Sequence, residues 1–301
     1  ESHHLMPDRT SVRGEAEFDP PGAFGSRMKS PVVLDVQNLS VDYVTEGKPP
    51  ARAVENVSFQ LHEGELMGLV GESGCGKTTL VMALTRLLGA SGQIVNGRVL
   101  FNNLDLTAAS EDELSDIRWK GISIIFQGAM NALNPVRTVG DQIAEAIIQH
   151  VRVDKEQDVD RRVVELLDLV GIAAKNKDHY PHQYSGGMRQ RAMIAMALAC
   201  APQVVIADEP TTALDVMIQA QILELLNDLR RKLGLAIIFV THDMIEALLL
   251  GDRIAVMQDG RIVQLGSPQE LLLHPANDYV SQLMSTPKRQ AHLLERLIGA
   301  S

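Results

Sequence analysis

The stretch Gly71-Glu72-Ser73-Gly74-Cys75-Gly76-Lys77-Thr78 contains the residue types that a loop needs to hold phosphate. It fits the pattern G-x-x-x-x-G-K-[ST] and follows an apolar run at 65–70. Glycines let the backbone wrap closely and direct its N–H groups at phosphate oxygens. Lys77 is then placed to contact the β- and γ-phosphates, and the Thr78 hydroxyl to bind Mg²⁺. In this setting the motif predicts a nucleotide-binding loop rather than a glycine-rich turn with a surface lysine.

Two adjacent acids, Asp208 and Glu209, close the apolar run VVIA at 204–207. Such a run is typical of a fully buried strand, and ligands bind at the carboxyl ends of strands in open α/β sheets. Neighbouring residues of a strand point to opposite sides, so the two carboxylates can have different roles. Asp208 is predicted to join the Mg²⁺ shell, and Glu209 to act as the base that orients or deprotonates water.

Two further predicted strands end in polar side chains. The run LAIIFVTHD (235–243) brings His242 to the same edge, where its ring can donate a hydrogen bond to the γ-phosphate. The run GISIIFQ (121–127) ends in Gln127, which we expect beside the metal or the attacking water. These residues together predict an enzyme that hydrolyses a nucleoside triphosphate. Its predicted catalytic residues are Glu209, His242 and Lys77, and its predicted metal ligands are Thr78, Gln127 and Asp208.

The stretch QYSGGMRQR (183–191) places Ser185, Gly186 and Gly187 at the entrance of a predicted helix. A helix N-terminus exposes unpaired N–H groups and a partial positive charge, so this arrangement can bind an anion. The other interpretation is an ordinary serine N-cap with a flexible entry turn. The stretch taken alone leaves both open.

The elements that would position these residues can be read from hydrophobic periodicity. Alternation at 32–44 and 53–61 predicts antiparallel strands, and Asn96-Gly97 predicts a hairpin turn. Asp259-Gly260 predicts a second, late hairpin. These strands indicate a small antiparallel β-subdomain beside the nucleotide.

The interval between Gln127 and Ser185 is predicted to be helical. Its run RRVVELLDLVGI places Val163, Leu166, Leu167 and Val170 on one helix face. Further along the chain, Asp215 is expected to cap a long helix.

Composition limits the class of protein. The chain has 301 residues, 45% of them hydrophobic, and a formal net charge of −10, which argues against a surface that coats nucleic acid. Aromatic residues make up 4%, too few for base-stacking platforms, and the apolar runs are too short to cross a bilayer. Two cysteines exclude a disulfide framework. Residues 1–27 lack periodicity and are interpreted as an expression leader or a disordered extension.

Six motifs occur in the order found in ATP-binding cassette (ABC) proteins, and 32–275 resembles that family. Gly71–Thr78 resembles the Walker A motif, Gln127 the Q-loop glutamine and VVIADE the Walker B motif. YSGGMRQ resembles the family signature, commonly LSGGQ, although Tyr184 and Met188 replace leucine and glutamine. The remaining matches are the D-loop at Ala213-Leu214-Asp215, the switch histidine at His242 and, upstream, an adenine-stacking aromatic at Tyr43.

The resemblance implies an α/β fold with a RecA-like P-loop NTPase core, an antiparallel β-subdomain and an inserted helical signature subdomain. The expected divisions are a nucleotide-binding domain at 28–275, with its helical part at about 128–190, and a helical tail at 276–301. The cofactors implied are ATP and Mg²⁺. The residues implied to bind ATP in the same chain are Tyr43, Gly71, Glu72, Ser73, Gly74, Cys75, Gly76, Lys77, Thr78, Thr79 and Gln127.

In this family two ATPase subunits form a head-to-tail dimer, in which the signature of one faces the P-loop of the other. The residues implied to act on the partner's nucleotide are Ser185, Gly186, Gly187, Met188 and Gln190, with Asp215 in the D-loop. The other partners implied are transmembrane permease subunits and an extracytoplasmic substrate-binding protein, with no nucleic acid. The implied location is peripheral, at the cytoplasmic face of the cell membrane.

A finer resemblance is to the ATPases of oligopeptide and dipeptide importers. It rests on VGESGCGKTT, FQGAMNALNPVRTVGDQI and YPHQYSGGMRQR. Two features depart from that subgroup: Gly128-Ala129 replaces the usual Asp-Pro, and no cysteine follows Cys200, where the subgroup carries an iron–sulfur cysteine cluster. Import of sugars, glycosides or metal complexes therefore stays open.

Two other classes of ATPase or nucleotide-binding protein fit the sequence less well. A soluble ABC ATPase that acts on nucleic acid or the ribosome would need a long coiled-coil insertion, a second cassette or a basic surface. A kinase or GTPase would not need the stretch at 185–190. The sequence favours a transport ATPase over both.

Overall fold

A six-stranded sheet positions the predicted site residues. In the computed structural model, which describes residues 30–128, 132–151 and 156–298, its strand order is β10-β9-β3-β8-β7-β6. The strands from β9 to β6 are parallel, and β10 (Arg261–Gly266) is antiparallel to β9 (Arg253–Gln258). The other four are β3 (Leu66–Val70), β6 (Ile122–Ile125), β7 (Val204–Asp208) and β8 (Ala236–Thr241). The predicted leader, 1–27, lies outside the described residues.

The parallel strands have both faces buried, which explains why their sequences are continuous apolar runs. Alternate residues of β7 point to different cores: Val205 and Ala207 join the helical side, whereas Val204 and Ile206 face the second sheet. The strands also end in register, since Val70 pairs with Thr241 and Asp208 pairs with Val240. Their carboxyl ends therefore meet at one edge, as the sequence predicts.

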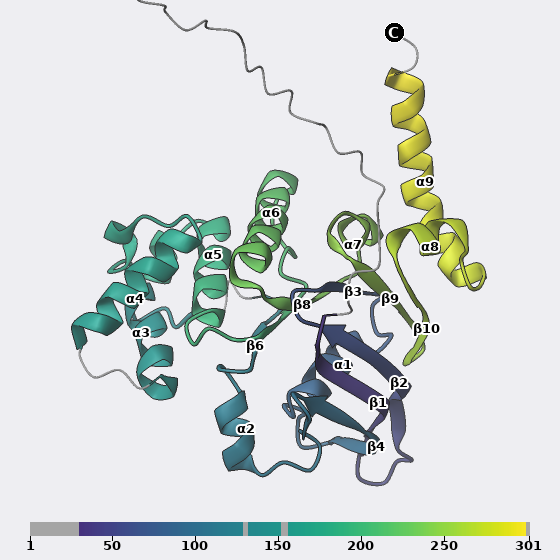
Figure 1. Ribbon diagram of the computed structural model, residues 1–301, viewed down its shortest axis with the longest axis horizontal. Helices are drawn as coiled ribbons and strands as arrows, with labels where there is room; N and C mark the ends of the chain where they lie inside the picture. The colour runs from purple at the N-terminus through teal and green to yellow at the C-terminus, as the bar shows by residue number, and fades with distance from the viewer. Residues whose placement is uncertain (1–29, 129–131, 152–155, 299–301) are drawn as a thin grey trace, which may run out of the picture. The chain divides into compact units, whose positions relative to one another are not determined.

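The second sheet is antiparallel, with the order β2-β1-β4-β5. Its strands are β1 (Val32–Tyr43), β2 (Ala51–His62), β4 (Gly92–Phe101) and β5 (Leu104–Asp105). The helix α1 (Lys77–Leu84) contacts β1, β2 and β7, so it packs between the two sheets (Figure 1). The predicted antiparallel strands are confirmed, and so is the turn at Asp259-Gly260 between β9 and β10.

The hairpin predicted at Asn96-Gly97 is wrong, because both residues lie inside β4. Gly97 has φ of 91° where the pairing with β1 shifts register between Gln37 and Ser40. A Cβ on Gly97 would lie 2.4 Å from the Gln37 carbonyl oxygen. The glycine therefore serves a bulge in a continuous strand, the other common use of an isolated glycine in a β-sequence.

Helices cover the other side of the six-stranded sheet (Figure 1). The described residues between Gln127 and Ser185 contain helices, as predicted, and the four apolar residues predicted to share a helix face (Val163, Leu166, Leu167 and Val170) are all buried. The helix α2 (Glu111–Ile117) packs instead on the side of the second sheet. The other helices among the described residues are α3 (Val139–His150), α4 (Glu156–Leu169), α5 (Gly186–Ala197), α6 (Val216–Leu233), α7 (Met244–Leu250), α8 (Pro268–Leu273) and α9 (Asp278–Ile298), with 3₁₀ turns η2 (Ala174–Asn176) and η3 (Pro181–Gln183).

Trp119, just before β6, stacks on His150 at the end of α3, with ring centroids 5.5 Å apart and planes 18° apart. The stack therefore joins the strand that leads to Gln127 to the first helix after it.

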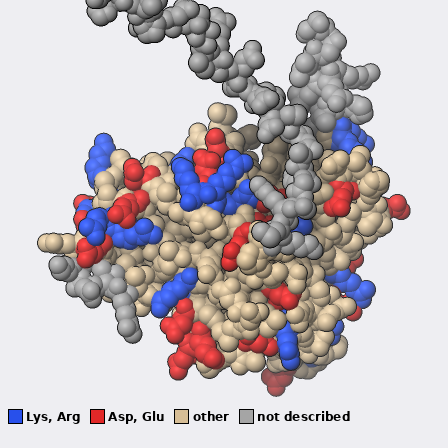
Figure 2. All heavy atoms as spheres, viewed as in Figure 1, with Lys and Arg blue, Asp and Glu red and all other residues tan. Residues whose placement is uncertain are grey.

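Among the described residues, no helix combines the length and apolar character needed to span a bilayer. On the face drawn in Figure 2, basic and acidic side chains are interspersed, with acidic side chains gathered over α2 and basic ones over the end of α6.

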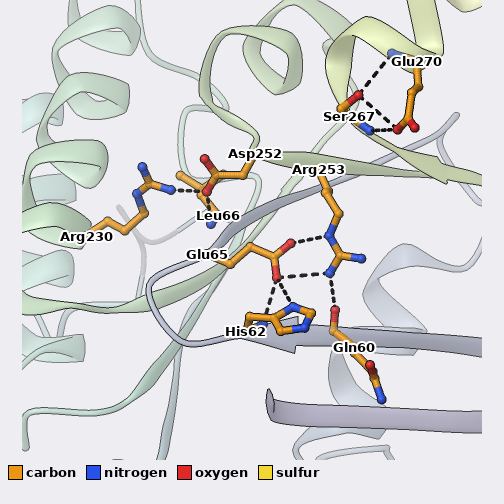
Figure 3. A network of polar contacts seen from close by, with 9 residues as sticks. All are labelled: Gln60, His62, Glu65, Leu66, Arg230, Asp252, Arg253, Ser267 and Glu270. Atoms are coloured by element: carbon orange, nitrogen blue, oxygen red, sulfur yellow. Dashed lines mark hydrogen bonds and ion pairs between the residues drawn. The ribbon is translucent and has the colours of Figure 1, made fainter. Parts of the chain in front are cut away.

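A polar network surrounds the N-terminal end of β3, opposite the end that leads into the phosphate-binding motif (Figure 3). Glu65 accepts hydrogen bonds from Arg253 Nε at 2.5 Å and from the backbone N–H of His62 at 2.8 Å. Asp252 pairs with Arg230 and accepts the N–H of Leu66 at 2.9 Å. These contacts fix the strand that leads into the phosphate-binding motif.

Candidate functional site

The loop at 71–76 follows β3 and enters α1, as the motif predicts. Its glycines are required by close packing. A Cβ on Gly71 would lie 2.2 Å from the Met257 carbonyl oxygen, and one on Gly76 would lie 2.4 Å from that of Ala53. Gly76 also has φ of 105°, a conformation that L-residues rarely adopt. The loop therefore keeps its shape only with glycine at both positions.

Lys77 folds back into this loop. Its ammonium donates hydrogen bonds to the carbonyl oxygens of Gly71 at 2.7 Å and Glu72 at 2.9 Å, and only 6% of the residue is exposed. A cation held inside a loop of backbone N–H groups is well placed to contact a phosphate. Cys75 contributes packing rather than charge, because burial raises the pKa of its thiol.

A contact from the last helix reaches the same loop. The N–H of Glu72 donates to the hydroxyl of Tyr279, at the start of α9, over 3.2 Å. Sequence reasoning missed this residue, because nothing in the pattern around it relates the tail to the loop.

Asp208 at the end of β7 is 2% exposed, and its Oδ1 has no hydrogen-bond partner in the described structure. Burial raises its pKa, and the charge of Glu209 acts in the same direction, whereas the Thr78 hydroxyl and Lys77 lower it. A buried carboxylate with one oxygen left without a partner is costly unless a cation compensates it. A carboxylate beside a hydroxyl is a donor set that suits Mg²⁺, which prefers oxygen ligands. Asp208 and Thr78 therefore fit the predicted metal.

Glu209 turns away from Asp208. It is a non-glycine residue with φ of 46°, and its N–H is held by the Val240 carbonyl at 3.0 Å. Its Oε2 accepts hydrogen bonds from Gln127 Nε2 at 2.7 Å and from the Thr212 hydroxyl at 3.0 Å. His242 Nδ1 lies 3.6 Å from its Oε1. The two adjacent acids thus have separate surroundings, and three side chains converge on the second one.

Two details of this cluster differ from the predicted ligand set. Gln127 contacts Glu209 in this structure, so its predicted metal contact stays a prediction. Thr212 was not singled out, although it lies in the same DEPTT stretch. A hydroxyl three residues after the predicted catalytic carboxylate is the signal that could have identified it.

Tyr43 lies at the end of β1, with its hydroxyl 3.3 Å from that of Thr79. Both residues line an open cavity of about 570 Å³, a volume typical of small-ligand sites. We call it the P-loop cavity. The cavity brings together most of the predicted nucleotide contacts: Tyr43, Ser73, Gly74, Gly76, Lys77, Thr78, Thr79, Gln127, Glu209 and His242, together with Ala53.

The stretch at 185–190 lies apart from this cavity, since none of its residues is among those that line it. Ser185 is the N-cap of α5, and its hydroxyl accepts the N–H of Met188 at 3.2 Å. Gly187 packs closely on α6, because a Cβ there would lie 2.9 Å from Ile218 Cγ2. Asp215 caps α6, as predicted. Gly186 is partly exposed and Gln190 is buried. The serine N-cap interpretation therefore holds within one copy, and it leaves Ser185 exposed.

Comparisons with known proteins agree with this geometry. The family model described as "ABC transporter" matches residues 54–212. The dipeptide transport ATP-binding protein of Bacillus subtilis is 45% identical over 85% of this chain and 77% of its own length. The oligopeptide transport ATP-binding protein of Escherichia coli is 41% identical over 88% and 78% of the two chains.

Solved structures match as well. An ATP-binding cassette in a dimeric post-hydrolysis state with ADP and Pi superposes with a TM-score of 0.69, at 30% identity over 78% of this chain and 98% of that one. A Clostridium perfringens cassette from an ABC transporter complex gives a TM-score of 0.70, at 28% identity over 88% and 99%.

Proposed function

This chain belongs to the ABC transporter family and is an ATPase that uses ATP and Mg²⁺, and we propose that it powers the import of peptides. The substrate class is supported by relatives named for dipeptide and oligopeptide transport at 41–45% identity. The soluble alternative that acts on nucleic acid or the ribosome is not favoured by these relatives. Sugars, glycosides and metal complexes have no support among the relatives described.

The single observation that carries the catalytic assignment is the convergence of Gln127, Thr212 and His242 on Glu209 beside the P-loop cavity. A carboxylate held at this position can orient a water molecule and accept its proton. Two hydrogen bonds fix its rotamer before substrate binds, which lowers the cost of reaching the reactive geometry. The proposed base is therefore preorganised.

The other residues have complementary roles in this proposal. The P-loop N–H groups and Lys77 bind the phosphates, and Tyr43 contacts the adenine. Asp208 and Thr78 would hold Mg²⁺, which neutralises phosphate charge when bound. His242 stabilises negative charge that develops on the transferring phosphoryl group.

The signature stretch acts on a second subunit in this proposal. Ser185 is exposed at the start of a helix and does not line the cavity of its own chain, which suits contact with a nucleotide held by a partner. ATP then closes two subunits, and loss of the γ-phosphate opens them. Transport complexes of this family pair two such subunits with permeases.

A groove on the helical region is the proposed docking site for a permease segment at the cytoplasmic face of the membrane. It measures about 490 Å³ and lies between α3 and α4. Ile148 on its wall is 64% exposed, and Val136 in the neighbouring loop is 79% exposed. Both residues follow Gln127 in the sequence, and Gln127 contacts Glu209. Binding of a permease segment in this groove would therefore change the position of Glu209. An extracytoplasmic binding protein would deliver the peptide.

Replacement of Glu209 by glutamine tests the assignment. It keeps the size of the side chain but removes the base, so turnover should stop while ATP binding persists. Glu224→Gln is the matched control, since Glu224 is exposed on α6. Hydrolysis is measured as phosphate release and binding by calorimetry. Brisk hydrolysis by the Glu209→Gln variant would exclude this residue as the base.

A further inference from the structure

A buried carboxylate lies outside the residues used above. Glu246, on α7, is 8% exposed and does not line the P-loop cavity. Burying a carboxylate is costly unless hydrogen bonds compensate for the lost water. A glutamate exposed on a short helix would pay no such desolvation cost. The burial of Glu246 therefore requires compensating contacts.

Two buried threonines supply those contacts. The Thr211 hydroxyl donates to Glu246 Oε1 at 3.0 Å, and the Thr241 hydroxyl donates to Oε2 at 2.6 Å. Their residues are 4% and 2% exposed. The N–H of Asp243 donates to the Thr241 oxygen at 3.0 Å, which leaves the hydroxyl proton of Thr241 for Glu246. Each carboxylate oxygen therefore has its own hydroxyl donor.

The two threonines belong to the two segments that carry the catalytic pair. Thr211 follows β7 and immediately precedes Thr212, the hydroxyl donor to Glu209. Thr241 is the last residue of β8 and immediately precedes His242. Only 3.6 Å separates His242 Nδ1 from Glu209 Oε1, although each side chain extends from a different strand end. The buried carboxylate of Glu246 thus connects the carboxyl ends of β7 and β8 through these two threonines.

The same contact reaches the D-loop. The Thr211 carbonyl accepts a hydrogen bond from Gln219 Nε2 of α6 at 3.4 Å, and α6 begins at its cap Asp215. Thr211 therefore contacts Glu246 through its side chain and α6 through its backbone carbonyl, and so links Glu246 to the segment at 211–215. Movement of the segment at 211–215 would therefore shift Thr241 through the carboxylate of Glu246.

We propose that Glu246 is a positioning residue for ATP hydrolysis, which clamps Thr211 to Thr241 and so fixes Glu209 relative to His242. The proposal rests on the catalytic roles assigned above to Glu209 and His242. Glu246 itself does not line the cavity that holds the predicted nucleotide contacts, so it acts on them through the two threonines. Its effect is on the turnover step, because the clamp sets the geometry of the base and leaves the P-loop contacts unchanged.

The test removes each donor separately in the full chain. Thr211→Val and Thr241→Val delete one hydroxyl at nearly constant volume, whereas Thr211→Ser and Thr241→Ser retain it. We expect each valine variant to lower kcat by about tenfold to a hundredfold, the range for a small misplacement of catalytic groups, with ATP affinity unchanged. The serine variants should keep most of the activity. Thr85→Val is the matched control, since Thr85 is equally buried and its hydroxyl bonds only within and beside α1.

A readout independent of turnover is hydrogen–deuterium exchange. A clamp predicts reciprocal effects: Thr211→Val should speed exchange in 241–246, and Thr241→Val should speed exchange in 209–215. Combining either change with Glu246→Gln should add little, because the members of one network act together. Unchanged kcat in both valine variants, or exchange that rises only beside each substitution, would overturn the proposal and leave Glu246 a packing residue.

The Glu209→Gln variant separates this proposal from the assignment on which it rests. If Glu209→Gln still hydrolyses ATP, the catalytic assignment fails. If Glu209→Gln is inactive while the valine variants match the wild type, only the clamp fails. Thermal unfolding of every variant identifies loss of folding, and the two conservative serine variants keep the test valid if a Glu246 variant does not fold.

Discussion

Gln127 Nε2 lies 2.7 Å from Glu209 Oε2, although the two residues are 82 positions apart. Gln127 follows β6 and begins the segment that leads into the helical region, whereas Glu209 follows β7. The contact therefore joins the start of the segment that carries the proposed permease groove to the proposed base. We therefore expect the rate of hydrolysis to depend on the position of the helices that follow Gln127.

Replacement of Gln127 by alanine should slow hydrolysis without preventing ATP binding. A hydrogen bond to a charged group is worth about 1.5–3 kcal/mol, which corresponds to roughly a ten- to hundredfold change in rate. Phosphate release and calorimetric binding would measure the two effects. Gln149→Ala, an exposed substitution on α3, is the control. A rate equal to that of the wild type would mean that the contact does not matter for turnover.

Gly76→Ala should abolish nucleotide binding and reduce stability. The new Cβ would lie 2.4 Å from the Ala53 carbonyl oxygen, at a φ of 105° that alanine rarely adopts. Backbone strain of this kind costs about 1–3 kcal/mol. ATP titration and thermal unfolding are the measurements. Gly89→Ala should be silent, because no atom lies within 4 Å of a Cβ at that position; normal binding by Gly76→Ala would contradict the packing argument.

Asp208→Asn should stabilise the nucleotide-free protein and at the same time remove its predicted metal ligand. It removes a buried charge whose Oδ1 has no partner among the described residues, so the nucleotide-free fold should gain stability. A gain of about 1 kcal/mol would raise Tm by roughly 2–4 °C. The Mg²⁺ dependence of ATP binding should disappear at the same time. Asp228→Asn, an exposed change on α6, should alter neither quantity; retained Mg²⁺ dependence in Asp208→Asn would exclude this carboxylate from the metal shell.

The Glu65 network should make stability depend on acid pH (Figure 3). Burial alone raises the pKa of Glu65, but the hydrogen bond from Arg253, the contacts from His62 and the Arg253 charge together lower it below its usual value. The native state then binds fewer protons than the unfolded chain. The stabilisation is present above the unfolded carboxyl pKa of about 4.3 and is lost as pH falls through the lower native value.

Urea unfolding between pH 7 and 3 would measure this effect. The wild type should lose more of its free energy of unfolding over the acid range than Glu65→Gln, which has no carboxyl to protonate at this position. Glu63→Gln, an exposed change two residues away, should follow the wild type. Parallel curves for the wild type and Glu65→Gln would rule out a contribution from this carboxylate.

Ile148→Glu should impair transport while leaving the ATPase of the purified chain intact. The substitution places a charge on the exposed wall of the groove between α3 and α4, where a permease segment would have to desolvate it. Uptake of a labelled dipeptide by cells that carry the variant is the measurement. Leu273→Glu, at a comparably exposed leucine on α8, is the control. Equal uptake by both variants would place the docking surface elsewhere.

The sequence predicted the positions of candidate site residues well where one strand end determines one side chain. Lys77, Asp208 and His242 each follow an apolar run, and parallel strands bring such positions to one edge. The helix caps at Ser185 and Asp215 were also predictable, because capping is a local property of a few residues.

Long-range contacts and bulges were not predictable in the same way. The bulge at Gly97 depends on the register of a partner strand, which the dipeptide Asn-Gly does not encode. The contact of Tyr279 with the P-loop joins residues 207 positions apart. Glu246 reads as an ordinary helix acid, and its burial follows only from the packing of α7 against β3 and β8.

The stack of Trp119 on His150 gives this chain an optical property. Trp119 is the only tryptophan in the sequence, so all indole fluorescence comes from the joint between β6 and α3. A rotation of α3 relative to the sheet that separates the two rings would change that emission. Nucleotide-driven rearrangement of the helical region can therefore be followed in real time in the unlabelled wild-type protein.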